Sequence, residues 1–127
     1  MIAVRYFSGS GNTKVFVESL GVPNTRIDSE TIADEVVEPF ILVAPTYCSH
    51  GSVGAIPAPV KKFLNRGNNR YFIRGVVACG DRNFGSTFCQ VGTEIRRRYN
   101  APILHQMELR GFDHDVQIVK ELIETWK

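Results

Sequence analysis

A turn rich in glycine and hydroxyl side chains joins the first apolar run of the chain, residues 2–7, to the first helical pattern. The candidate residues in this turn are Ser8, Gly9, Ser10, Gly11, Asn12 and Thr13. Glycine adopts backbone angles closed to other residues, and the first N–H groups of a helix have no partner inside it. We therefore expect a strand, a tight turn and a helix N-terminus that together hold a phosphate by hydrogen bonds and the helix dipole.

The same turn is also typical of an ordinary helix cap, so phosphate binding and plain capping both stay open for this stretch alone. Two named phosphate motifs are excluded. The Walker pattern needs Gly-Lys followed by Ser or Thr, and no such segment follows these glycines. The dinucleotide fingerprint needs a third glycine where Asn12, Thr13 and Lys14 stand. A mononucleotide is therefore the better candidate ligand.

Strand and helix patterns alternate along the rest of the chain. Unbroken apolar runs at 40–44 and 75–79 are typical of parallel strands buried on both faces, whereas the alternating residues 103–109 predict an edge strand. A short edge strand is expected at 25–27, followed by at most a turn of helix before residue 40. Apolar stripes predict helices at about 13–20, 57–67, 86–99 and 113–126, the last capped by Asp113.

These elements predict an α/β fold with a doubly wound, five-stranded parallel sheet of order 2-1-3-4-5 and helices on both faces. Ligands bind such sheets at the carboxyl ends of the strands. We expect the rings of Tyr47 and Phe84 to flank a flat heterocycle near the phosphate turn, and flavin mononucleotide (FMN) fits this combination. The loops after the third and fourth strands supply the candidate residues Thr46, Tyr47, Cys48 and Gly51, and Gly80, Asn83, Phe84 and Gly85.

The composition narrows the class of protein. With 127 residues, 43% of them hydrophobic, the chain is predicted to form one globular domain, 1–127. No apolar run approaches the length of a membrane span and the chain enters a strand directly, so we expect a cytoplasmic protein without membrane contact. The net charge of +2 does not favour nucleic acid, and Arg96–Arg98 is interpreted as a solvated helix end.

Competing sites on this architecture lack their key residues. A phospho-receiver needs acidic residues after the first strand and an Asp after the third, where this chain has Ser8 and Pro45. A low-molecular-weight phosphatase needs a nucleophilic Cys in the first loop, which holds none. Cys48 and His50 are too close in one loop for a third group to orient both as a nucleophile and its base. No metal site is expected, and Cys79 and Cys89 are predicted to be small buried apolar residues.

Several segments follow the pattern of a known family: 6–13, 45–54, 63–65, 74–76, 80–85, 102–104 and 108–111. The most specific is the loop Arg82-Asn83-Phe84-Gly85. On these segments the chain resembles, over essentially its whole length, the NrdI-type flavodoxins, small flavoproteins that serve class Ib ribonucleotide reductase. The family often has a small hydroxyl residue where this chain has Phe112, and a more glycine-rich loop where it has Cys48 and His50.

The resemblance implies a flavodoxin-like fold and FMN as the cofactor. It also implies that the reduced flavin converts dioxygen to superoxide, which reaches the dimanganese small subunit of the reductase and allows its tyrosyl radical cofactor to form. A flavin-reducing reductase or redoxin is the second implied partner, and no side chain is expected to act as an acid or base. Two alternatives stay open: a general electron-transfer flavodoxin, and a flavin-free α/β module that binds a protein partner through its basic helix end and open loops.

Overall fold

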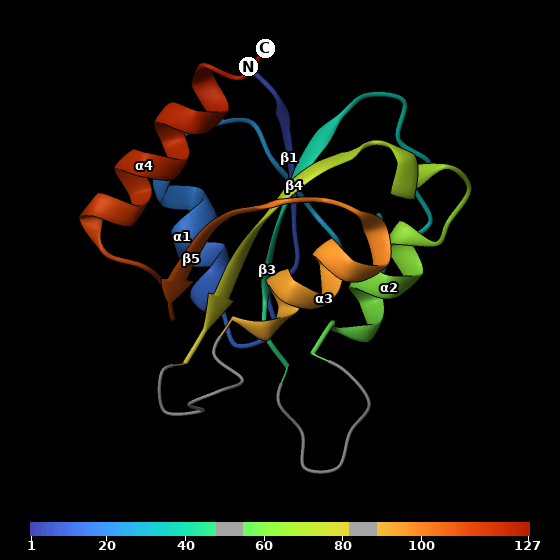
Figure 1. Cartoon of the computed structure of the whole chain (residues 1–127), viewed down its shortest axis with the longest axis horizontal. Helices are drawn as coiled ribbons and strands as arrows, with labels where there is room; N and C mark the ends of the chain where they lie inside the picture. The colour runs from blue at the N-terminus through green and yellow to red at the C-terminus, as the bar shows by residue number, and fades with distance from the viewer. Residues whose placement is uncertain (48–54, 82–88) are drawn as a thin grey trace.

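The central sheet has the predicted strand order. The computed structural model describes residues 1–47, 55–81 and 89–127. Within these ranges, parallel strands form one sheet of order β2-β1-β3-β4-β5 (Figure 1). The carboxyl ends of the strands therefore meet at one edge of the sheet, at the bottom of the view. The strands are β1 (Ala3–Tyr6), β2 (Thr25–Arg26), β3 (Phe40–Pro45), β4 (Ile73–Gly80) and β5 (Ile103–Glu108).

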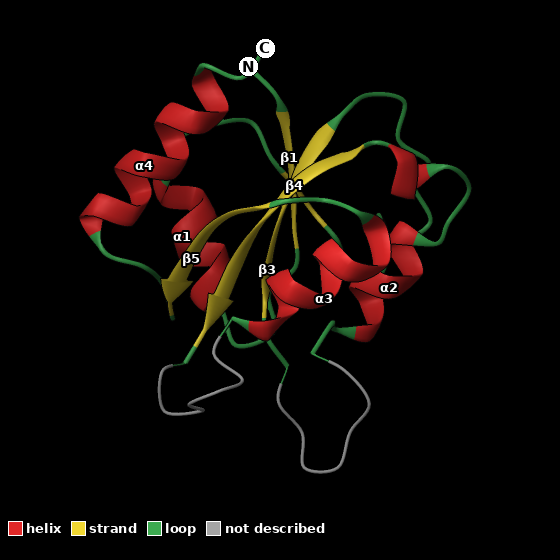
Figure 2. Ribbon diagram, in the orientation of Figure 1, coloured by secondary structure: helices red, strands yellow, loops and turns green. Residues whose placement is uncertain are grey.

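Helices cover both faces of the sheet. Those described are α1 (Asn12–Ser19), α2 (Ala58–Leu64), α3 (Gln90–Tyr99) and α4 (Asp113–Glu124), with a 3-10 helix η1 (Asn69–Tyr71) before β4. Helices α1 and α4 lie on one face and α2 and α3 on the other (Figure 2). This is the predicted doubly wound arrangement, in which right-handed crossovers cover one face where the strand order runs from β1 to β2 and the other face where it runs from β3 to β5. No helix in the described ranges is long and apolar enough to cross a bilayer.

Strand β3 shows why the sequence selects this architecture. Its first five residues are at most 1% exposed. Phe40, Leu42 and Ala44 belong to the core cluster that includes residues of α2 and α3, whereas Ile41 and Val43 belong to the cluster with residues of α1 and α4. Because successive side chains of a strand point to opposite faces, an unbroken apolar run requires cover on both. The predicted burial of this strand on two faces is confirmed.

Two helix starts differ from the sequence prediction. Helix α3 begins at Gln90, later than the predicted start near residue 86, because Cys89 is its N-cap and has a left-handed φ of 55°; residues 86–88 lie outside the described part of the chain. The N-cap of α4 is Phe112, one residue before the predicted Asp113. The physical reason is Asp115, whose carboxylate accepts the Phe112 N–H at 2.8 Å and so supports the cap from inside the first turn.

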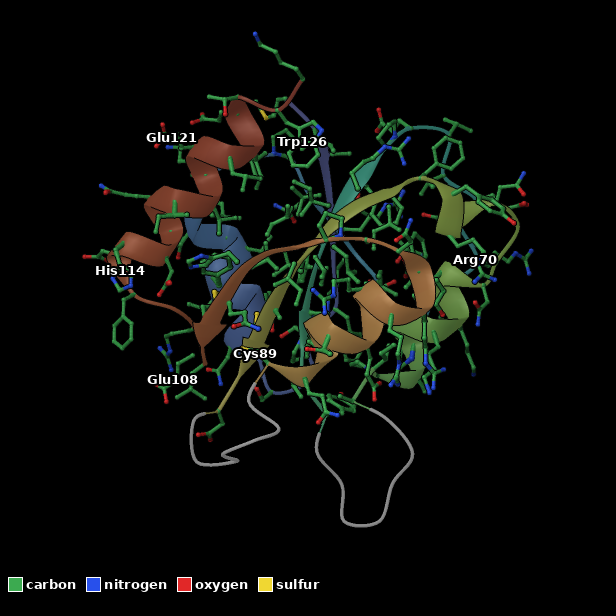
Figure 3. The ribbon with its side chains drawn as sticks, viewed as in Figure 1. Arg70, Cys89, Glu108, His114, Glu121 and Trp126 are labelled. Carbon is green, nitrogen blue, oxygen red and sulfur yellow. The ribbon has the colours of Figure 1, made fainter. Side chains whose placement is uncertain are left out.

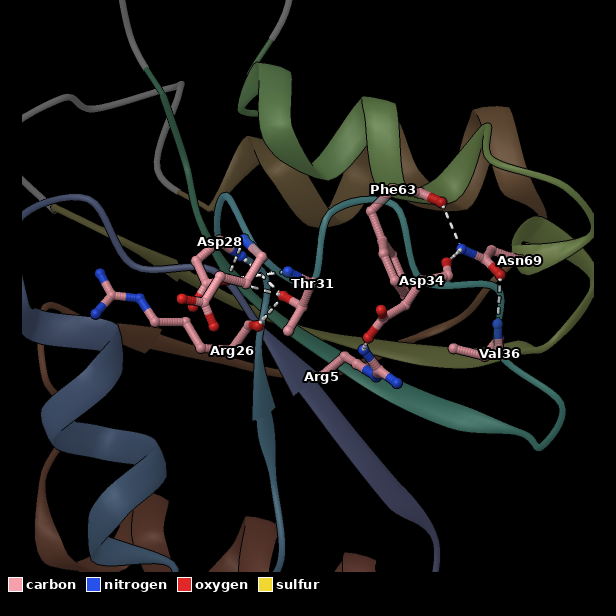
Figure 4. Close-up of polar contacts among 9 residues, drawn as sticks. Arg5, Arg26, Asp28, Thr31, Asp34, Val36, Phe63 and Asn69 are labelled. Atoms are coloured by element: carbon pink, nitrogen blue, oxygen red, sulfur yellow. Dashed lines mark hydrogen bonds and ion pairs between the residues drawn. The ribbon is translucent and has the colours of Figure 1, made fainter.

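The buried side chain of Asn69 holds the connection between β2 and β3, which has no helix of its own (Figure 4). Its amide donates to the carbonyls of Asp34 and Phe63, both at 2.8 Å, and accepts the Val36 N–H at 2.8 Å. Asn69 is 0% exposed. Arg5 adds an ion pair with Asp34 at 2.9 Å. One side chain from η1 therefore ties this connection to α2, a link that sequence reasoning missed.

We expect Asn69→Ala to lower the free energy of unfolding in urea by about 2–4 kcal/mol, because two carbonyls and one N–H would be left without their partner. Asn68→Ala is the matched control. Asn68 is exposed and its side chain makes no capping hydrogen bond, so its loss should cost less than about 0.5 kcal/mol. Equal effects of the two substitutions would contradict the anchoring role of Asn69.

Candidate functional site

The predicted phosphate turn lies between β1 and α1 at the carboxyl edge of the sheet. Gly11 is the N-cap of α1 and has a left-handed φ of 102°, which favours glycine. Ser8 is buried, and its hydroxyl oxygen accepts the N–H of Lys14 at 3.2 Å. The N–H groups of Asn12 and Thr13 lie in the first helical turn, where no carbonyl within the helix can accept them. Donors of this kind are what an anion site at a helix N-terminus requires.

A cavity of about 290 Å³, here called the carboxyl-edge hollow, opens beside this turn. Its walls come from the start of α1 and from the ends of β3, β4 and β5. The lining residues are Ser10, Asn12, Thr13, Pro45, Thr46, Cys79, Gly80, Asp81 and Leu109. The structure therefore brings together five residues selected from the sequence, namely Ser10, Asn12, Thr13, Thr46 and Gly80.

Tyr47 lies against the phosphate turn. Its ring packs edge-on against Phe7 with the ring centroids 5.9 Å apart, and 43% of the residue stays exposed. A Cβ atom at Gly9 would lie 2.6 Å from the Tyr47 hydroxyl oxygen, closer than two such atoms can approach. Glycine at position 9 therefore allows Tyr47 to take this place. The Tyr47 N–H donates to the Ala55 carbonyl at 2.9 Å and closes the base of the loop.

Two further polar contacts hold the same loop base. The Thr46 hydroxyl oxygen accepts the Val91 N–H, in the first turn of α3, at 3.3 Å. Glu94 is only 6% exposed, and its carboxylate accepts the Ala55 N–H at 2.8 Å. Sequence reasoning missed Glu94. Its place beside Ile95 on the buried side of α3 was the available signal, because a carboxylate on an apolar face needs a partner.

Several predicted site residues lie outside the described part of the chain. They are Cys48, Gly51, Asn83, Phe84 and Gly85, together with His50 in the loop after β3. Their contribution to a ring-binding site stays a prediction. The described residues comprise the turn between β1 and α1, Tyr47 and the residues that line the carboxyl-edge hollow.

The two cysteines in the described part of this edge, Cys79 and Cys89, are unsuited to nucleophilic chemistry. Burial raises the pKa of the Cys79 thiol to about 12, and a hydrogen bond with the Thr13 side chain opposes this only in part. Cys89 is 0% exposed, and its thiol donates to the carbonyls of Ala78 and Met107 at 3.3 and 3.4 Å. Both cysteines are buried, as predicted from the sequence.

Asp81 and Leu109 line the carboxyl-edge hollow, although sequence reasoning did not select them. Leu109 has a φ of 52°, which is uncommon for a residue other than glycine, and it is 43% exposed. Its N–H donates to the Gly80 carbonyl at 2.8 Å, which continues the β4–β5 ladder by one residue. Both residues directly follow a strand that ends at this edge, and that position was the signal that could have identified them.

A carboxylate with two histidine neighbours lies at the start of α4. His105 Nε2 is 2.6 Å and His114 Nε2 is 3.5 Å from Asp115 Oδ1. Burial acts to raise the pKa of Asp115, but hydrogen bonds from the Phe112 N–H and His105, with the charges of both histidines, hold it below its usual value. Phe112, one of the residues at which the sequence departs from the resemblance, is the N-cap of α4. It is 60% exposed, and its ring stacks on that of His114.

Comparison with known proteins gives a consistent family match. The family model described as "NrdI Flavodoxin like" matches residues 4–121. "Protein NrdI" of Brucella ovis (strain ATCC 25840 / 63/290 / NCTC 10512) is 47% identical over 128 aligned positions, which cover 99% of this chain and 95% of that protein. "Protein NrdI" of Brucella canis (strain ATCC 23365 / NCTC 10854 / RM-666) matches with the same identity and coverage.

Solved structures share the fold at low sequence identity. A short-chain flavodoxin associated with a non-canonical PDU bacterial microcompartment is 18% identical, with a TM-score of 0.63 over 97% of this chain and 93% of that one. Oxidised flavodoxin 2 from Bacillus cereus is also 18% identical, with a TM-score of 0.60 over 98% and 96% of the two chains. These likenesses support the predicted flavodoxin-like sheet.

We expect Gly9→Ala to displace the Tyr47 ring, because the new methyl group and the Tyr47 hydroxyl oxygen cannot both keep their positions. In NMR spectra, the contacts between the ring protons of Phe7 and Tyr47 should weaken. The double variant Gly9→Ala/Tyr47→Phe should restore them, because the next ring atom lies 3.5 Å from the new Cβ, and Tyr47→Phe alone serves as the control. Ring contacts that stay lost in the double variant would show that the hydroxyl clash is not the cause.

Proposed function

Because the chain belongs to the NrdI flavodoxin-like family, we propose that it is an FMN-binding redox protein that works with class Ib ribonucleotide reductase. The observation that carries this proposal is the carboxyl-edge hollow, where the phosphate turn meets the residues that follow three strands. Burial raises the pKa of the Cys79 thiol in its wall to about 12, so this residue does not supply a thiolate nucleophile.

The described residues of the hollow suit the phosphate end of FMN. Donors come from the first-turn N–H groups of α1, the Ser10 hydroxyl and the Asn12 amide, and the helix dipole favours a negative charge there. Tyr47, beside Gly9, would flank the ring system from the adjacent loop. Thr46 and Gly80 would contribute from the ends of β3 and β4.

Bound FMN would supply the electrons that convert dioxygen to superoxide. The role of the chain is to hold the cofactor at the open edge of the sheet, so that a partner covering this edge receives the oxidant before it escapes to bulk water. The partner we infer is the dimanganese small subunit of the reductase, whose tyrosyl radical cofactor would form as a result. A flavin-reducing reductase or redoxin in the cytoplasm would restore the electrons.

The contact face for that partner would be the carboxyl edge itself. Tyr47 and Leu109 are each 43% exposed at this edge, so an aromatic and an aliphatic side chain are accessible to a partner there. Exposed apolar anchors surrounded by polar groups are typical of protein interfaces. We expect His50, in the loop after β3, and Asn83 and Phe84, in the loop after β4, to lie with Tyr47 near the centre of this face.

A general electron-transfer flavodoxin is the second candidate, favoured by the likeness of the fold to two flavodoxins. It would exchange electrons with a redox partner and would not deliver an oxidant to a metal subunit. The two functions differ in whether dioxygen is required.

We expect Ser10→Ala to weaken FMN binding roughly ten- to hundredfold, because a hydrogen bond to a charged phosphate contributes about 1.5–3 kcal/mol. Lys14→Ala is the neighbouring control. The exposed Lys14 side chain is not among the residues that line the hollow, so its removal should change the affinity less than threefold. Fluorescence titration of apoprotein with FMN measures both, and an unaffected Ser10→Ala variant would contradict this phosphate site.

The functional test mixes the FMN-loaded, reduced protein with the manganese-loaded small subunit of its own reductase and dioxygen. Tyrosyl radical should appear in the electron paramagnetic resonance spectrum, and hydrogen peroxide without this protein should give none. The same mixture without dioxygen is the control. Radical formed equally well without the protein, or none formed with it, would reject the activation role in favour of general electron transfer.

A further inference from the structure

A second, larger cavity of about 540 Å³ lies away from the carboxyl edge. It is bounded by η1, the start of β4, the end of α3 and the segment leading to β5. Arg70, one of its residues, lies on the opposite side of the molecule from Glu108, which ends β5 (Figure 3). We call this cavity the arginine hollow. Its lining residues are Arg70, Tyr71, Ile73, Arg74, Arg98, Tyr99, Asn100 and Pro102.

The arginine hollow carries uncompensated positive charge. Three of its lining residues are arginines and none is acidic. Arg70, Arg74 and Arg98 are all exposed, and none forms an ion pair with another residue in the described part of the chain. The remaining 12 basic residues of the protein are outnumbered by its 13 acidic ones. The three arginines therefore concentrate positive charge in a protein whose basic and acidic residues are otherwise nearly balanced.

Internal contacts orient two of these guanidinium groups. Arg70 lies over the ring of Tyr99, with its central carbon 5.2 Å from the ring centroid. Arg74 donates through Nη1 to the Tyr71 carbonyl at 2.9 Å. A guanidinium group carries five N–H donors in a planar fork, so most donors of each group stay available. Because these side chains are already oriented, they lose less conformational entropy when a ligand binds.

The third arginine, Arg98, lines the same cavity as Arg70, Arg74 and Tyr99. Burial raises the pKa of the Tyr99 hydroxyl, while the charges of Arg70 and Arg98 both act to lower it. Arg98 also stands in the last turn of α3, where a cation complements the helix dipole. The helix dipole alone is a sufficient reason for an arginine at position 98. It gives no reason for Arg70 and Arg74 to line the same cavity.

The geometry decides which anion fits. An acidic peptide spreads its carboxylates along several residues, whereas three arginines around one hollow match charge concentrated on a few adjacent atoms, as in linked phosphates. Tyr71 supplies a second feature, a ring that is 70% exposed beside the arginines. An exposed aromatic ring next to phosphate-binding arginines offers a surface on which a base can stack.

We propose that the arginine hollow binds a nucleoside polyphosphate, with its phosphates on Arg70, Arg74 and Arg98 and its base on Tyr71. The volume of about 540 Å³ lies within the range of small-ligand sites, which is roughly 300–1,000 Å³. The site is separate from the carboxyl-edge hollow, and the two share no lining residue. Binding there does not depend on the function proposed above.

The test is isothermal titration calorimetry on the full-length, FMN-loaded protein at low ionic strength, with ATP as the probe. Arg74→Gln should weaken ATP binding at least tenfold, because a charge-assisted hydrogen bond is lost. Lys120→Gln removes an equal charge from the exposed side of α4 and should leave the affinity within twofold. No ATP binding to the parent protein, or equal losses in both variants, would overturn the proposal.

Companion probes separate the base from the phosphates. Tyr71→Ala should weaken ATP binding at least fivefold and leave the binding of inorganic tripolyphosphate unchanged, because only the nucleotide has a ring to stack. Tripolyphosphate that binds the parent protein as tightly as ATP would reject the base contact. A decaglutamate peptide that binds more tightly than ATP would overturn the proposal and assign the hollow to an acidic protein partner.

Discussion

The parallel pairing of β1 with β3 is the constraint on which the site depends. The two strands are aligned from Ala3 opposite Phe40 to Tyr6 opposite Val43, and the Phe7 N–H continues the ladder to the Val43 carbonyl at 3.1 Å. Because β2 occupies the other side of β1, the chain leaves these neighbouring strands toward opposite faces of the sheet. The crevice between their ends is where the phosphate turn and the loop after β3 meet.

Backbone pairing beyond the strand ends sets the walls of this crevice. The Thr46 N–H donates to the Cys79 carbonyl at 2.8 Å, and the Leu109 N–H donates to the Gly80 carbonyl at 2.8 Å. Each loop therefore leaves the sheet from a fixed position. Groups held by a rigid sheet edge lose little freedom when a ligand binds, which favours affinity without further side-chain contacts.

The hydrophobic pattern of the sequence predicted those elements whose burial depends only on neighbouring residues in the chain. The apolar run of β3 and its cover on two faces could be read from the sequence because side-chain alternation in a strand is a property of the backbone. The contacts of Asn69 and Glu94 could not, because a polar side chain reveals its partners only after folding brings distant segments together. The cap of α4 was placed one residue late for a related reason, since Asp113 is a good cap by residue type and the carboxylate of Asp115 moves the boundary.

The hydrogen bond between Asn69 and Val36 has a consequence for how the protein is made. Its two residues are 33 positions apart, and the anchor comes second in the chain. During translation, the segment before β3 leaves the ribosome without the residue that fixes it, and it must wait for α2 and η1 to emerge. The connection between β2 and β3 therefore lacks this anchor until the second half of the chain has been synthesised.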